Sequence, residues 1–231
     1  MKLLEKKTLH EEIADTLRDL IIKGELQEGD KINENELCAA MGISKTPLRE
    51  ALRVLSVEGL VQLVPNRGSY VAKPTFEEIK EMFDVMSALE GLCARTAAEK
   101  MSDKDLSHLE KLHNKLEEKY ESRDLKGYLR YNDIYHSFLQ DLAGNTTLNQ
   151  MIKGLRKKIL LYRLQSLALP ERLDHSIKEH RELIKIFRKR DSERAEGLMR
   201  KHLKAQCDAI EKLRETILIK STFHRSTSIV P

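Results

Sequence analysis

Apolar residues recur every three or four positions along most of this chain, which is the spacing of amphipathic helices. From residue 76 onward this helical pattern is the only one present. The helices that it predicts span 76–100, 103–120, 124–143, 147–167, 174–189 and 192–219. Each break between them carries a cap-type residue or a helix breaker. Six helices with short connections predict an antiparallel bundle.

The first third of the chain has a different plan. A helical pattern over 8–23 opens with Thr8 and Glu11, which form a capping-box sequence. Two shorter helical patterns then meet at a tight glycine turn, and two β-branched runs follow on either side of Asn66-Arg67-Gly68; these four segments are 34–41, 45–58, 60–64 and 69–72. Asn33 precedes the second helix as an N-cap. Helix, turn, helix and hairpin in this order predict a winged helix-turn-helix.

These patterns divide the chain at Lys73-Pro74-Thr75, where proline ends the second run and threonine can cap the next helix. We therefore predict a mainly α protein with an N-terminal winged helix-turn-helix over 1–74. An antiparallel all-α bundle for effector binding and dimerisation follows over 75–220. Residues 221–231 show no periodicity and are expected to form a flexible tail.

Composition narrows the function classes. About 34% of the 231 residues are charged, and no apolar run is long enough to cross a membrane. Because the N-terminus also lacks a secretion signal, we expect a cytoplasmic protein without a membrane partner. The three cysteines lie far apart in helical patterns, which favours buried thiols over a cysteine metal site. No phosphate-binding loop, nucleophile elbow or dinucleotide-binding glycine pattern occurs, so we expect no enzyme.

Positive charge is concentrated in the second half of the winged helix. Residues 1–75 contain 11 Lys and Arg against 12 Asp and Glu. From Ser44 to Lys73, however, five basic residues face only two acidic ones. Such a local excess favours DNA as the partner, because phosphates respond to nearby charge more than to the total. The net charge of −1 leaves open the alternative of a protein-interaction module.

Three of the eight histidines lie on apolar helix stripes, where polar residues are unexpected. His136, His180 and His202 belong to three separate predicted helices, and Asn132 precedes His136 by one turn. Buried imidazoles must be hydrogen-bonded or bound to metal. Two interpretations follow: three separate core histidines, or one closed metal cluster. The second also allows an alternative function, a metal-dependent enzyme with an accessory winged helix, in which bound water could serve as the nucleophile.

Several longer motifs resemble a known family. The run TPLREALR at 46–53 is followed by EGLV at 58–61 and GSYV at 68–71, and the second half carries ALE at 88–90, NDIYH at 132–136, EH at 179–180 and HL at 202–203. Together they resemble the GntR superfamily of bacterial transcription factors. The second half is similar to the FCD ligand-binding domain of its FadR subfamily. In its number of predicted helices, six, the second half is more similar to the shorter VanR-type branch than to the seven-helix FadR-type branch.

The resemblance implies a set of residues that contact DNA. They are Ser44, Lys45, Thr46 and Arg49 at the start of the second helix of the motif, with Arg67 and Gly68 in the wing. Lys45 stands where Arg is usual and is expected to contact phosphate, whereas Arg49 is expected to read a guanine edge. Asn35 stands where many relatives carry a DNA-contacting Arg. A homodimer on a palindromic operator is also implied. The sequence leaves activation open, and we expect a repressor.

The resemblance also implies a metal site and an effector. Its ligands would be Asn132, His136, His180 and His202, with Asn132 at a position that is more often Asp. Three imidazoles suit Zn²⁺ or Ni²⁺, and Mn²⁺ is compatible. The effector implied is a small organic acid bound near the metal. Met86 occupies a position where relatives commonly have Arg, which removes one cation from the expected effector site.

Overall fold

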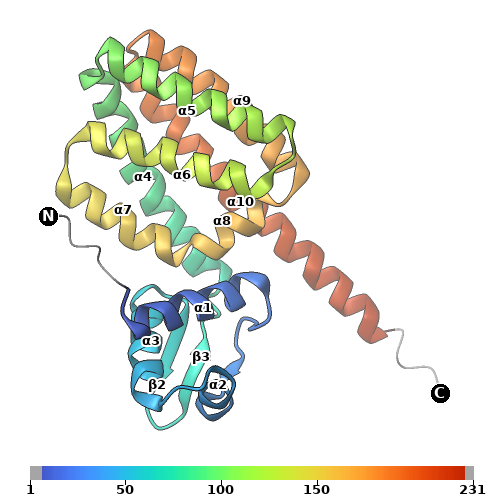
Figure 1. Cartoon of the computed structure of the whole chain (residues 1–231). Helices are drawn as coiled ribbons and strands as arrows, with labels where there is room; N and C mark the ends of the chain where they lie inside the picture. Colours follow the sequence, from blue (N-terminus) through green and yellow to red (C-terminus); the bar gives the residue numbers. More distant parts are fainter. Residues whose placement is uncertain (1–6, 227–231) are drawn as a thin grey trace, which may run out of the picture. The chain divides into compact units, whose positions relative to one another are not determined.

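The computed structural model describes residues 7–226, with side chains described through residue 216 apart from Pro170. The chain forms two compact units, Met1–Thr75 and Phe76–Pro231. No helix in the described part of the chain is both long enough and apolar enough to span a bilayer. Helices dominate both units, and the N-terminal one adds a small sheet (Figure 1).

The N-terminal unit is a winged helix-turn-helix. Its elements are α1 (Leu9–Lys23), β1 (Lys31–Ile32), α2 (Glu34–Met41), α3 (Lys45–Val57), β2 (Val61–Val64) and β3 (Gly68–Val71). The three strands form an antiparallel sheet in the order β1-β3-β2, so the hairpin β2–β3 is the wing. Strand β1 was not predicted, because two residues are too short to show a period of two.

The ends of these helices follow the predicted capping residues. The Thr8 backbone N–H donates to Glu11 Oε2 at 2.8 Å, which closes the capping box of α1. Asn33 Oδ1 accepts the N–H groups of Asn35 and Glu36 at the start of α2. Gly42 ends α2 with φ of 65°, a left-handed conformation that most residues avoid, and so makes the turn to α3.

The C-terminal unit is a bundle of helices. They are α4 (Phe76–Lys100), α5 (Asp103–Glu121), α6 (Leu125–Ala143), α7 (Thr146–Lys158), α8 (Leu160–Leu167), α9 (Pro170–Arg188) and α10 (Ser192–Ser226). Helices α4, α5 and α6 agree with their predicted ranges to within a residue.

The remaining helices correct the prediction. The single helix expected over 147–167 is divided at Ile159, a fully buried residue with φ of −96° and ψ of 5°. The described bundle therefore has seven helices instead of the predicted six, so the number of helices does not favour the shorter branch. Helix α9 begins at Pro170, because proline is tolerated in a first turn. Helix α10 continues to Ser226, into the predicted tail, of which 227–231 lie outside the described residues.

Helices α4 and α10 pack closely and form the centre of the bundle. On α4, Gly91 faces α10, since a Cβ added there would lie 2.6 Å from Arg200 Cγ. Ala94, Ala97 and Ala98 are completely buried on the following turns of α4. Small side chains at these positions let the two helices approach each other. As a result, residues of α4 and α10 reach the same interior region as α6 and α9.

Candidate metal centre

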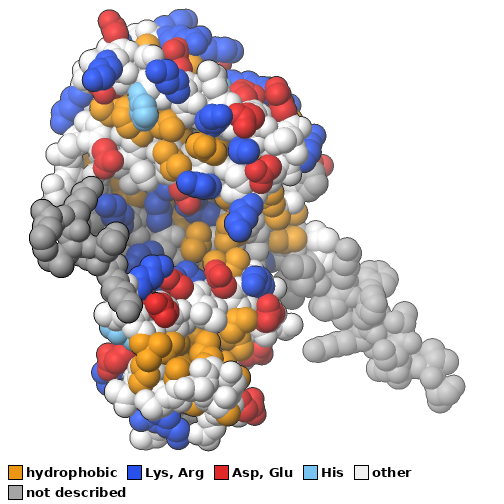
Figure 2. All heavy atoms as spheres, viewed as in Figure 1, with side chains coloured by type: hydrophobic (Ala, Val, Ile, Leu, Met, Phe, Trp, Pro, Cys, Tyr) orange, Lys and Arg blue, Asp and Glu red, His pale blue; other side chains and the backbone are white. Residues whose placement is uncertain are grey.

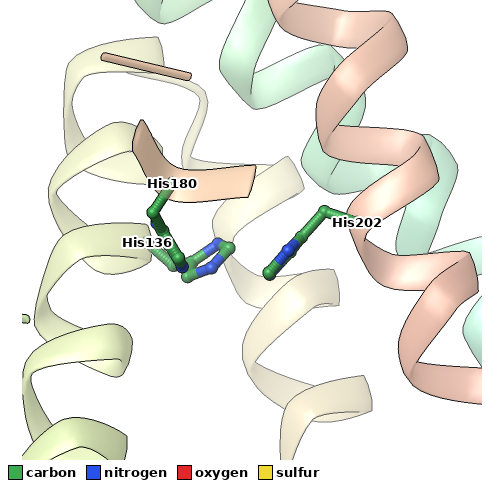
Figure 3. A group of neighbouring side chains, drawn as sticks. All are labelled: His136, His180 and His202. Carbon is green, nitrogen blue, oxygen red and sulfur yellow. The ribbon is translucent and has the colours of Figure 1, made fainter. Parts of the chain in front are cut away.

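Three imidazoles from three helices meet inside the bundle. His136 comes from α6, His180 from α9 and His202 from α10 (Figure 3). One ring nitrogen of each lies within 4.8 Å of the other two, and the ring centroids are 5.1–5.5 Å apart. All three side chains are at most 2% exposed. The structure thus brings together the three histidines that the sequence singled out.

One nitrogen of each ring lacks a hydrogen-bond partner among the described residues. These atoms are His136 Nε2, His180 Nδ1 and His202 Nε2. Asn132 is also fully buried; its Oδ1 lies 2.9 Å from His180 Nε2, and its Nδ2 is without a partner in the same region. Separate core histidines would be expected to have their polar atoms satisfied, because each buried orphan costs about 1–3 kcal/mol. The unpaired Nε2 atoms of His136 and His202, beside the contact of His180 Nε2 with Asn132 Oδ1, therefore fit a divalent cation as a shared partner.

Carboxylates hold the opposite nitrogens of two of the rings. His136 Nδ1 lies 2.8 Å from Glu90 Oε2, and His202 Nδ1 lies 2.5 Å from Glu179 Oε2. Such pairs place the ring proton on Nδ1 and leave the lone pair of Nε2 directed to the centre, as in carboxylate–histidine–zinc arrangements. Burial lowers the pKa of His136 to about 4, although the Glu90 charge acts to raise it. Burial likewise lowers the pKa of His180 and His202. Neutral imidazoles are the form that binds metal.

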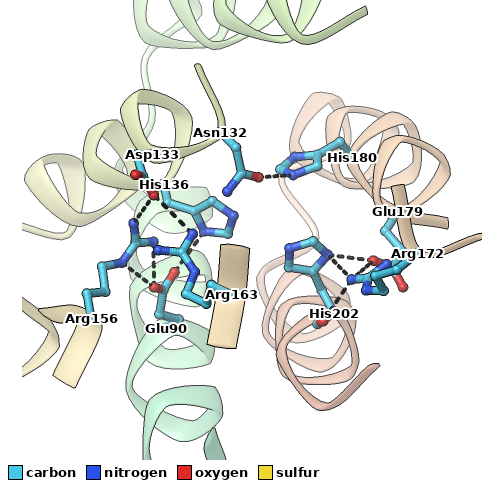
Figure 4. A network of polar contacts seen from close by, with 10 residues as sticks. All are labelled: Glu90, Asn132, Asp133, His136, Arg156, Arg163, Arg172, Glu179, His180 and His202. Atoms are coloured by element: carbon cyan, nitrogen blue, oxygen red, sulfur yellow. Dashed lines mark hydrogen bonds and ion pairs between the residues drawn. The ribbon is translucent and has the colours of Figure 1, made fainter. Parts of the chain in front are cut away.

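Arginines in turn neutralise these carboxylates (Figure 4). Glu90 Oε1 accepts from Arg156 Nη2 at 2.6 Å and from Arg156 Nε at 2.8 Å. Asp133 on α6 accepts from Arg156 and from Arg163 at 3.2 and 3.0 Å. Burial acts to raise the pKa of Glu90, but the charge of Arg156 and the hydrogen bond with His136 outweigh it and lower the pKa well below its usual range. Glu90 is therefore ionised in the interior.

The second pair has the same organisation. Arg172 Nη2 donates to Glu179 Oε2 at 2.7 Å and to the His202 backbone carbonyl at 3.1 Å. Sequence reasoning missed Arg156, Arg163 and Arg172, because arginine is common in this chain and none belongs to a motif. One sequence signal was available for Arg163, which lies among apolar residues of its helix. Arg172 offered none, although the structure leaves both side chains buried, at 5% and 4% exposure.

The residues expected to contact DNA lie on the N-terminal unit. Ser44, Lys45, Thr46 and Arg49 are exposed at the start of α3, and Arg67 and Gly68 are exposed at the tip of the wing. Except for Ser44 and Thr46, they line one open groove of about 640 Å³, which Asn35 also lines. The Arg49 Nε–H donates to Glu34 Oε2 at 2.8 Å, so an acid of α2 holds this arginine at the groove.

Comparison with known protein families identifies both halves of the chain. Residues 81–205 match the model of the FCD domain, and residues 9–71 match that of the bacterial regulatory proteins of the gntR family. This chain belongs to the GntR family of transcriptional regulators, with an FCD domain as its second half. The GntR regulator is thus a DNA-binding protein by family. The family is one of transcriptional regulators rather than enzymes, which argues against the two alternative functions considered above.

Relatives of known sequence or structure agree with this assignment. The regulator is 24% identical over 200 residues to the uncharacterized HTH-type transcriptional regulator YdhC of Bacillus subtilis, covering 86% of this chain and 89% of that one. It is 25% identical over 210 residues to the HTH-type transcriptional repressor RspR of Escherichia coli, covering 90% and 91%. Its fold is similar to the solved structure of E. coli McbR/YncC, with a TM-score of 0.72, 20% identity, and coverage of 90% and 100%.

Proposed function

We propose that this regulator is a metal-containing repressor whose affinity for its operator is controlled by a small organic acid bound in the bundle. The observation that supports this proposal is the set of three buried imidazoles, each with one ring nitrogen within 4.8 Å of a ring nitrogen of the other two. His136, His180 and His202 would hold the cation, with Asn132 Oδ1 as a fourth donor. Three nitrogen donors suit Zn²⁺ or Ni²⁺ best, and Mn²⁺ remains compatible.

Charge balance supports an anionic effector. The carboxylates around the histidines are matched by an equal number of arginines; the six residues are Glu90, Asp133, Glu179, Arg156, Arg163 and Arg172. Asn132 and the neutral imidazoles contribute no charge. A divalent cation bound there would supply two uncompensated positive charges and a preference for an anionic oxygen ligand. A carboxylate meets both requirements, because the cation offsets the cost of desolvating the anion.

Control of DNA binding requires that the acid bind one arrangement of the protein better than another. A homodimer provides two winged helices for the two halves of a palindrome, which is how symmetric regulators read DNA. An acid that favours an arrangement with the wrong spacing of the two winged helices would release the operator. Repression is the outcome proposed, in keeping with the repressor among the relatives.

The DNA-binding part is tested by selecting duplexes from a random-sequence library with the purified full-length protein. The selected duplex should be palindromic and should bind far more tightly than a scrambled duplex. Arg49→Ala should lose most of that preference, since a bidentate arginine–guanine contact is worth about 1–3 kcal/mol. An Arg49→Ala protein with unchanged preference would contradict the assignment of this residue.

The effector part is tested by a thermal-shift screen of small carboxylates and sugar acids. A ligand at 100 times its Kd should stabilise the folded state by about 2.7 kcal/mol. The shift should be larger for zinc-loaded protein than for protein treated with a chelator, and the same acid should weaken binding to the selected duplex. An acid that binds without any change in DNA affinity would argue against control by that acid.

A further inference from the structure

Strand β1 places a lysine beside the wing that no motif assigns to DNA binding. Lys31 is exposed, whereas the next residue, Ile32, is 3% exposed, so the two side chains point to opposite sides of the strand. Lys31 pairs with Tyr70 across the antiparallel ladder of β1 and β3. Its Cε would lie 3.6 Å from a Cβ added at Gly68. Lys31 precedes the helix-turn-helix in the sequence but thus lies beside Gly68, at the tip of the wing.

Lys31 lines the same groove as the residues already assigned to DNA. The basic residues around this groove are Lys31, Lys45, Arg49 and Arg67, and the acidic ones are Glu34 and Glu36. Because Glu34 accepts a hydrogen bond from Arg49 at 2.8 Å, it offsets the charge of that arginine. Lys31 therefore supplies a large part of the remaining positive charge. In Figure 2, basic side chains gather at the end of the N-terminal unit where the hairpin β2–β3 turns.

The chemistry of the groove suits a phosphate near Lys31. Gly68 has φ of 102° and no side chain, so a ligand can approach the wing backbone closely there. The lysine stem runs beside this glycine and carries an ammonium group on a flexible chain. Lysine acts as a point charge toward phosphate, whereas base reading favours the planar fork of arginine.

We propose that Lys31 is a phosphate-contacting residue of the DNA interface, so that strand β1 binds the DNA backbone beside the wing. This inference rests on the DNA-binding function of the family. One phosphate contact contributes about 0.9 to the slope of log K against log salt concentration. Loss of the Lys31 charge should therefore reduce that slope by about 0.9 for each chain bound to the duplex. If the contact is purely electrostatic, affinity falls about 15-fold at 0.05 M salt and about 4-fold at 0.2 M, per chain.

The experiment compares Lys31→Met with wild type and with Lys23→Met in the full-length protein. Lys31→Met removes the charge and keeps an aliphatic stem beside Gly68. Lys23 is a matched control, because it is exposed at the end of α1 and does not line the groove. Fluorescence anisotropy is measured on the selected duplex and on a 30-base-pair scrambled duplex, from 0.05 to 0.2 M KCl. Far-UV circular dichroism checks that each variant is folded.

The expected result is that Lys31→Met weakens binding to both duplexes by the same factor and lowers both salt slopes. Lys23→Met should behave as wild type. Equal slopes for wild type and Lys31→Met would overturn the proposal while leaving DNA binding itself intact. A loss confined to the selected duplex would also overturn it, because it would show a base contact. If wild type bound neither duplex, the DNA-binding function would fail together with this inference.

Discussion

Replacing Glu90 with glutamine tests how the bundle organises its histidines. The side chain is 3% exposed, and its two oxygens contact Arg156 and His136. Glutamine has nearly the same shape but no charge. If its carbonyl faces Arg156, its NH₂ group faces His136 Nδ1 and must donate to it. The imidazole proton then moves to Nε2, the nitrogen that is directed to the centre.

Two magnitudes follow from this geometry. Removing one partner of a buried ion pair costs about 3–5 kcal/mol, because the other charge is left buried without compensation. Here Asp133 still contacts Arg156 at 3.2 Å, which places the expected loss of stability near the lower limit, about 3 kcal/mol. Metal affinity should fall about 10- to 100-fold, the usual effect of losing the group that orients a ligating histidine.

Urea unfolding of metal-free protein, followed by circular dichroism, measures the first quantity, and competition with a chromophoric chelator measures the second. Glu196→Gln is the matched control. Glu196 has a side-chain exposure of 24% and pairs with Arg200 and Arg95 at 3.3 and 3.5 Å, so its change should cost at most about 1 kcal/mol. Glu90 does not organise the histidines if Glu90→Gln unfolds at the same urea concentration as Glu196→Gln and binds metal as tightly as wild type.

Four further substitutions have defined outcomes. Asn132→Asp adds a negative charge to the donors, so chelator competition should show metal affinity raised at least about tenfold; unchanged affinity would remove Asn132 from the ligand set. Gly42→Ala should lower the free energy of unfolding of the N-terminal unit by about 1–2 kcal/mol, measured in urea, because alanine is strained at a φ of 65°. No steric clash adds to this cost, since the added Cβ meets no atom within 4 Å. Tyr128→Phe should cost about 1 kcal/mol, since its buried hydroxyl donates to Ser176 Oγ at 2.8 Å. Tyr135→Phe should cost nothing, since its hydroxyl has no partner among the described residues.

The fold could be predicted where helical periodicity and capping residues coincide. The ranges of α4, α5 and α6 agree with their patterns, and Asn33 caps α2 as expected. The division at Ile159 could not be predicted, because neither glycine nor proline lies there and the apolar stripe continues through it. The division separates α7, which carries Arg156, from α8, which carries Arg163, and both arginines contact Asp133.

The candidate site was predictable only in part. His136, His180 and His202 could be found because each interrupts an apolar stripe, where a polar residue requires an explanation. The arginine and carboxylate partners could not, since Glu90 and Arg156 are 66 residues apart and meet only through the packing of α4 with α7. Helix periodicity gives the face of each helix but not which helices are neighbours. For the same reason the position of Lys31 beside the wing could not be predicted, because it depends on the pairing of β1 with β3.

The metal content of the purified protein shows directly whether the three buried histidines bind a cation. Wild type and His180→Ala are dialysed against zinc, freed of excess ion, and measured by elemental analysis alongside the folded control Glu196→Gln. We expect about one zinc ion per chain in wild type and in Glu196→Gln, and far less in His180→Ala. His136→Gln should lose metal as well. This second variant keeps the test valid if His180→Ala does not fold. Equal and negligible zinc in all four folded proteins would mean that the histidines do not form a metal site.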